Sequence, residues 1–153
     1  MASWIVHLRI AENFLNQVRG LDPALFCIGN IAPDSGIPDE KWEYFDPPSE
    51  ISHFKAFSKQ KWNLADLDFY RQYLQPLVRE SPNSDRFSFL LGYFFHLITD
   101  NLWGKEIYRP TCRHFANEFK NDPDFIWQIK RDWYGLDFEY VRENPGSIFW
   151  EVF

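Results

Sequence analysis

The chain has 153 residues, of which 45% are hydrophobic and 20% aromatic. That is enough apolar surface for one domain with a substantial core, and the length is too short for two, so we expect a single domain over residues 1–153. The formal net charge is −6, and no basic stripe is visible in the sequence, which argues against binding to duplex nucleic acid. An excess of carboxylates suits a cation site, although a solvated acidic surface explains it equally simply.

The cysteines and the amino-terminal residues bear on the cellular compartment. Cys27 and Cys112 lie far apart with no CxxC pair, which favours packing roles in a reducing environment. No signal peptide opens the chain, and no run of about 18 apolar residues occurs. We therefore expect a cytoplasmic protein without a transmembrane segment.

Helical periodicity dominates the first 30 residues. Apolar residues recur at helical spacing from Trp4 to Arg19, with Ser3 as the expected N-cap and Gly20 as the stop. The pair Asp22–Pro23 predicts a second helix over Ala24–Ile28. From 29 to about 63, four prolines and two glycines predict irregular chain. A loop of that length is usually functional or disordered, and its many aromatic residues favour a packed, functional loop.

Helical patterns return after the loop. They predict helices over 66–80 (kinked near Pro76), 85–108, 111–120, 123–134 (ended by Gly135) and 137–143. The second of these is apolar on every side, so it is the expected centre of the bundle. The apolar stretch 148–153 should dock on the core. No alternating strand pattern appears, so the predicted fold class is an all-α multi-helix bundle with a long irregular loop after the second helix.

The sharpest chemical signal is the pair His96 and Asp100, which a spacing of four places on one face of the central helix. A shared metal ion would satisfy both groups, and so would a buried hydrogen bond between them. Asp34 and His53 lie in the long loop, where Asp34 is either an inward-pointing ligand or the acceptor of a local turn. His7 lies at the edge of the apolar face of the first helix.

Taken together, these side chains are the ligand types of zinc or a similar divalent ion. His114 and Glu118 repeat the spacing of four on a later helix, where an exposed pair is an equally good interpretation.

Four segments occur in the order found in zinc-dependent phospholipase C proteins, whose superfamily includes the fungal single-strand nucleases. They are Trp4–His7, Gly29–Asp34, Ser52–Phe54 and Gly92–Asp100. Over about the first 105 residues the chain resembles this family. The resemblance implies an all-α fold with up to three zinc ions.

The resemblance also implies roles for the ligands. Asp34, His53, His96 and Asp100 would hold one ion, and Asp100 would bridge to a second ion held by His7. For the third site only His114 and Glu118 are candidates, because Glu106 stands where the family has a histidine. Trp4, whose family counterpart supplies an amino-terminal ligand, is preceded here by three residues, so one or two ions are also consistent with the sequence.

We therefore predict a metal-dependent hydrolase of phosphate esters, such as a phospholipid or a nucleotide. Asp34 would serve as both ligand and proton acceptor. Four loop aromatics are candidates to line the substrate pocket or simply to pack in the core: Trp42, Tyr44, Phe45 and Trp62. The alternative is a non-catalytic helical binding module that keeps a structural metal or a buried His–Asp network.

Overall fold

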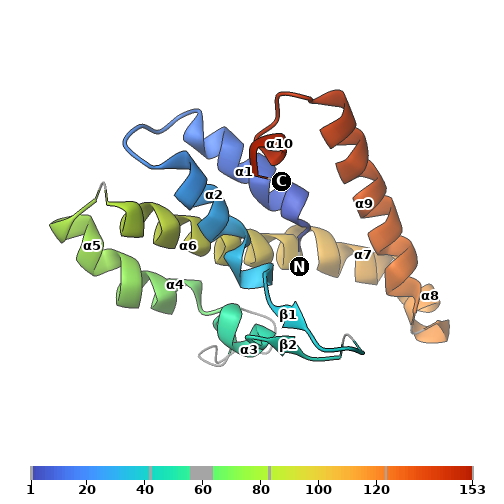
Figure 1. Ribbon diagram of the computed structural model, residues 1–153. Coiled ribbons are helices and arrows are strands. Elements are labelled where there is room, and N and C mark those ends of the chain that lie inside the picture. The colour runs from blue at the N-terminus through green and yellow to red at the C-terminus, as the bar shows by residue number, and fades with distance from the viewer. Residues whose placement is uncertain (1, 42, 56–63, 83, 123, 153) are drawn as a thin grey trace.

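The computed structural model describes residues 2–41, 43–55, 64–82, 84–122 and 124–152. Its centre is α6 (Asp85–Trp103), which packs most extensively against α2 (Pro23–Ile31), with α1 (Trp4–Leu15) beside them. Figure 1 shows these three helices forming the body of the molecule. The predicted all-α bundle with a central apolar helix is confirmed.

Two glycines bring α2 and α6 together at their backbones. A Cβ atom at Gly92 would lie 2.0 Å from the carbonyl oxygen of Phe26, and one at Gly29 would lie 2.0 Å from that of Phe89. Only residues without a side chain fit such an approach. The close contact fixes α2 against the segment of α6 that carries His96.

The connection from α2 to α6 contains short elements. They are the 3₁₀ turn η1 (Ala32–Asp34), the strands β1 (Ile37–Pro38) and β2 (Phe45–Asp46), α3 (Ser49–Ser52), α4 (Asp66–Phe69), the π-turn η3 (Tyr70–Leu74) and α5 (Gln75–Glu80). The two strands pair antiparallel, with Ile37 opposite Asp46. Strands of two residues are too short to produce an alternating pattern, which is why the sequence did not predict them.

Past α6, the chain continues through the π-turn η4 (Gly104–Tyr108), α7 (Arg109–His114), α8 (Ala116–Asn121), α9 (Phe125–Glu143) and α10 (Phe149–Val152). The helix predicted over 111–120 is wrong, because the backbone leaves helical geometry at Phe115 (φ −102°, ψ 35°). The two helices predicted on either side of Gly135 are one helix, α9. A glycine inside a helix costs only about 1 kcal/mol, which the buried residues Ile129, Asp137 and Val141 of the same helix can offset.

The ends of the helices follow the expected capping in part. Ser3 and Asp22 accept the N–H groups of Val6 and Leu25, as N-caps do. The first helix ends earlier than predicted, at Leu15, and Gly20 adopts a left-handed conformation (φ 88°) in the connection to α2. Ile148, Phe149 and Val152 pack against the core cluster around Leu8, so the carboxyl-terminal stretch docks as expected. None of the described helices has the length and apolar character needed to cross a bilayer.

Candidate metal centre

Five of the predicted ligands lie together in the interior. His7 comes from α1, Asp34 from the end of η1, His53 from the residue after α3, and His96 and Asp100 from α6. Their side chains are 0% (His7), 12% (Asp34), 2% (His53), 0% (His96) and 5% (Asp100) exposed. Elements that are distant in sequence thus converge on one buried polar site, and Asp34 is its most solvent-accessible member.

The first group of donors consists of Asp34, His53 and His96, with Asp100 beside them. His53 Nε2 lies 3.1 Å from Asp34 Oδ1 and 3.3 Å from His96 Nε2. His96 Nε2 lies 4.0 Å from Asp34 Oδ1, and Asp100 Oδ2 lies 3.7 Å from Nε2 of both histidines. Donors around a tetrahedral zinc ion are separated by about 3.3–3.4 Å, given metal–ligand distances of about 2.0–2.1 Å. The His53–Asp34 and His53–His96 distances are near this spacing and the other three are longer, so the four side chains would have to draw together to hold an ion.

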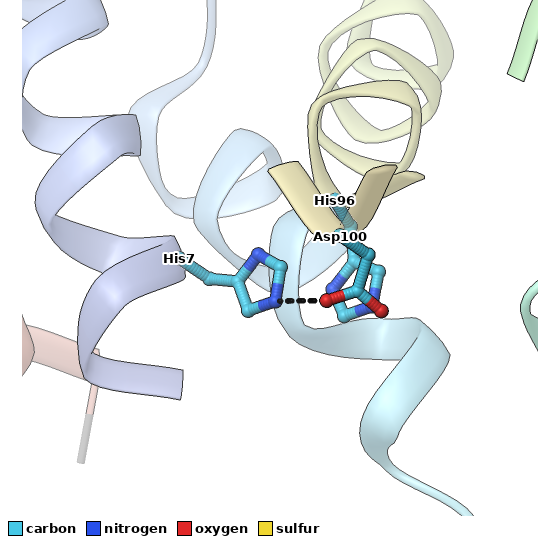
Figure 2. A group of neighbouring side chains, drawn as sticks. All are labelled: His7, His96 and Asp100. Atoms are coloured by element: carbon cyan, nitrogen blue, oxygen red, sulfur yellow. Dashed lines mark ion pairs between the residues drawn. The ribbon is translucent and has the colours of Figure 1, made fainter. Parts of the chain in front are cut away.

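The second group consists of His7, His96 and Asp100 (Figure 2). The rings of His7 and His96 stack with centroids 3.9 Å apart and 6° between their planes. His7 Nε2 points toward Asp100 Oδ1 at 3.6 Å, which is too long for a hydrogen bond, and neither ring nitrogen has a hydrogen-bond partner among the described residues. Because a buried polar atom without a partner is unfavourable, His7 fits a site that receives a cation.

Neighbouring groups orient the two histidines of the first group. His96 Nδ1 donates to the carbonyl oxygen of Asn30 at 2.8 Å, so Nδ1 carries the proton and Nε2 presents its lone pair to the cluster. His53 Nδ1 lies 3.0 Å from Ser52 Oγ, and the Tyr93 hydroxyl donates to the carbonyl oxygen of Ser52. Such outer partners fix the tautomer and orientation of metal-binding histidines.

Sequence reasoning did not assign roles to Asn30, Ser52 or Tyr93. The only available signal was their position next to the candidate ligands. The contact from Asn30 uses a backbone carbonyl, which any residue has, so its identity carries no information about this role.

The electrostatics of the cluster favour the protonation states that a metal requires. Burial opposes ionisation of Asp34 and Asp100, but the neighbouring histidines outweigh it, and the pKa of each carboxyl lies below its usual value. Burial, together with the nearby His7, lowers the pKa of His96 to about 4. At neutral pH, two anionic carboxylates and a neutral imidazole are therefore available, as metal ligation demands.

The remaining predicted residues lie elsewhere. His114 and Glu118 are exposed on α7 and α8, separated by the break at Phe115, and join neither donor group; Glu106 is also exposed. Tyr44 and Phe45, 73% and 42% exposed, lie on the hairpin segment that projects from the bundle in Figure 1. Trp42 and Trp62 fall outside the described residues. The structure therefore gathers the first five candidates and does not gather the third-site pair.

Comparison with protein families gives a match to a family described as zinc dependent phospholipase C, over residues 6–129. The chain belongs to this family. The match includes all five converging residues. It begins at the third residue of α1 and ends within the first turns of α9. Comparisons with curated proteins and with solved structures give no significant match.

Zinc dependence in the family agrees with the chemistry of the site. Imidazole and carboxylate donors suit zinc, Asp34, His53 and His96 lie together as one donor group, and His7 is buried without a hydrogen-bond partner among the described residues. The residues present therefore fit the metal that the family implies. His53, His96, Asp34 and Asp100 would hold it.

Proposed function

We propose that this protein is a metal-dependent hydrolase of phosphate esters with a phospholipase C-like reaction, centred on Asp34, His53, His96 and Asp100. The observation that carries the proposal is the convergence of two histidines and two carboxylates inside a domain of the zinc-dependent phospholipase C family. The nitrogens of His53 and His96 lie 3.3 Å apart and within 3.1–4.0 Å of oxygens of Asp34 and Asp100. A bound zinc ion would supply Lewis acidity, making a water molecule more acidic and polarising the phosphoryl group.

The donors available support a proposal for the number of ions. His96 belongs to both groups but has one free ring nitrogen, because Nδ1 donates to Asn30. If His96 serves the first group, only His7 and one oxygen of Asp100 remain for a second ion. We therefore propose one firmly held ion and weak binding of any second ion.

Asp34 is the proposed proton acceptor. It is the most exposed of the five side chains, so a water molecule entering the site from solvent meets it first. Its lowered pKa keeps it ionised at neutral pH. Asp34 Oδ1 lies 3.1 Å from His53 Nε2, on the side of the proposed ion. With Oδ1 on the ion, the other carboxylate oxygen would be free to orient and deprotonate the attacking water.

The substrate class is proposed from the family. Its name points to a phospholipid, and a nucleotide phosphodiester is the alternative because it offers the same reacting group. Activity assays with a phosphatidylcholine and with a nucleotide diester distinguish these two substrate classes.

Replacement of Asp34 tests the proposed function. Asp34→Asn keeps the size of the side chain but removes its charge, so we expect turnover of a chromogenic phosphodiester to fall at least about 100-fold. Circular dichroism should show unchanged helicity. Asp132→Asn, which changes an exposed aspartate on α9, is the matched control and should retain full activity. Equal turnover by wild type and Asp34→Asn would refute the role of Asp34.

The enclosure of the cluster favours one rival function. Four of the five side chains are at most 5% exposed, as in a structural metal site of a non-catalytic binding module. That rival predicts zinc-loaded protein without turnover of any phosphate ester. Turnover that is lost with chelator and restored by zinc would exclude it.

A further inference from the structure

Helix α9 carries a stripe of aromatic side chains that the core does not cover. Trp127, Tyr134 and Phe138 are 58%, 41% and 66% exposed. Their spacing, with Arg131 between them, is that of residues one or two turns apart on the same face of a helix. Together with Lys130 and Gly135, these four residues line an open hollow on the surface. We call these six residues the α9 stripe.

The stripe is positively charged within an acidic protein. Lys130 Nζ lies 4.5 Å from the centroid of the Trp127 ring, and neither Lys130 nor Arg131 pairs with an acidic side chain in the described part of the chain. The exposed acidic residues of α9, Asp132, Glu139 and Glu143, lie roughly 120–160° around the helix from Trp127. Charge is therefore separated on α9, although the chain as a whole carries −6.

Hydrogen bonds through the amino-terminal residues connect helix α9 to the candidate metal centre. Ser3 Oγ donates to the Asp137 carboxylate of α9, and the N–H of the preceding residue, Ala2, donates to Asp100 Oδ1 at 2.9 Å. The helix that carries the stripe is therefore held beside the Asp100 side of the cluster. Figure 1 shows α9 running along one side of the molecule, beyond α1, where a large partner can approach it.

We propose that the α9 stripe docks this protein on a lipid surface containing anionic headgroups. The proposal rests on the phosphate-ester hydrolase function, because docking through α9 would bring the candidate metal centre close to a surface that contains phospholipids. Aromatic rings are favoured at the boundary between headgroups and acyl chains. Lysine and arginine beside the rings attract anionic headgroups. Because salt screens charges beyond about a Debye length, acidic residues on the far side of the protein repel the same headgroups only weakly.

Vesicle binding in the presence of chelator tests docking without hydrolysis. The probes are vesicles of phosphatidylcholine alone and of phosphatidylcholine mixed with phosphatidylglycerol. We expect co-flotation mainly with the mixed vesicles, weakening as salt rises. Lys130→Gln/Arg131→Gln should reduce the partition coefficient about 25-fold, because each basic residue contributes about fivefold near an anionic surface.

The aromatic contribution has a matched control on the same helix. Phe138 and Leu136 are each 66% exposed, but Leu136 lies on the opposite face of α9. Phe138→Ala should weaken binding to mixed vesicles roughly tenfold, and Leu136→Ala should leave it unchanged. Equal effects of the two substitutions, or no vesicle binding by wild type, would overturn the proposal. So would a concentration-dependent dimer that Phe138→Ala abolishes and Leu136→Ala does not.

Kinetics separate docking from the proposed reaction. The Lys130→Gln/Arg131→Gln protein should hydrolyse a soluble chromogenic phosphodiester as wild type does, and should lose activity only toward mixed vesicles. Vesicle binding without turnover of any phosphate ester would refute the hydrolase and leave docking standing. Turnover of the soluble ester without vesicle binding would refute docking alone.

Discussion

The imidazole rings of His7 and His96 stack 3.9 Å apart with 6° between their planes, although the residues are 89 positions apart in the chain. Two stacked imidazoles cannot both carry a positive charge without strong repulsion. Burial and this neighbour lower the pKa of His96 to about 4. Burial and the stacked ring of His7 together keep His96 neutral at physiological pH, with its free ring nitrogen directed at the two carboxylates.

The stability of the metal-free protein should fall as the pH falls. An unfolded histidine titrates near pH 6.5 and folded His96 near 4, so between these values the unfolded state binds more protons. Stability is thus highest above about pH 6.5 and is lost toward pH 4. Asp34 and Asp100, whose folded pKa values are lowered, extend the loss below about pH 4. Urea unfolding of chelator-treated protein at pH 7, 6 and 5 measures the free energy of unfolding as a function of pH. His96→Gln should make that free energy less dependent on pH. If the free energy of unfolding has the same pH dependence in wild type and in His96→Gln, titration of His96 is not its cause.

Chelator should lower the thermal midpoint of protein purified with its metal. A ligand that binds only the folded state stabilises it by about 2.7 kcal/mol at a hundredfold excess over Kd. The variant His96→Leu/Asp100→Leu should not respond to chelator, and His114→Leu, at an exposed histidine, should respond as wild type does. If the wild-type midpoint does not move, a buried His–Asp network without metal explains the cluster better.

Metal analysis should find one tightly held equivalent of zinc. Since His96 can serve one ion only, the Asp34 group is complete and the His7 group is left with two donors. His53→Ala should lose the tight equivalent, and His7→Ala should keep it. Two equivalents of similar affinity, measured by competition with a chromophoric chelator, would show that a ligand outside these five contributes.

Ser52→Ala should weaken zinc binding without removing a ligand. Ser52 Oγ is the partner of His53 Nδ1, and loss of such a partner typically lowers metal affinity 10–100-fold. Ser81→Ala, at an exposed serine after α5, is the control. Unchanged affinity in Ser52→Ala would mean that the surrounding protein alone positions the His53 ring.

The same substitution should have opposite effects at two helical glycines. Gly92→Ala places a Cβ atom 2.0 Å from the Phe26 carbonyl oxygen, so α2 and α6 must separate, at a cost of at least about 2 kcal/mol. Gly135→Ala meets no atom within 4 Å and should stabilise α9 by about 0.5–1 kcal/mol. Denaturant unfolding compares the two. Destabilisation by Gly135→Ala would contradict the open environment of that position.

The sequence by itself determined the class of fold and part of the site. The continuous apolar helix around His96, the caps at Ser3 and Asp22, and the spacing of His96 and Asp100 are local features, governed by helical periodicity and hydrogen bonding within a few residues. The resemblance to the family added His7, Asp34 and His53 as ligands. Local pattern failed at Gly135, where the helix continues, and at Phe115, where it is interrupted.

Only the tertiary structure decided how the five ligands meet. The distance between His53 and His96 depends on the path of the chain through η1, the hairpin and α3, and the stacking of His7 on His96 depends on how α1 lies against α6. Neither is encoded in the spacing of residues along the chain. Gly29 and Gly92 lie where α2 and α6 cross, and because neither has a side chain the two backbones approach closely there. This approach brings the Asn30 carbonyl to His96. The periodicity of the sequence does not reveal how closely two helices pack.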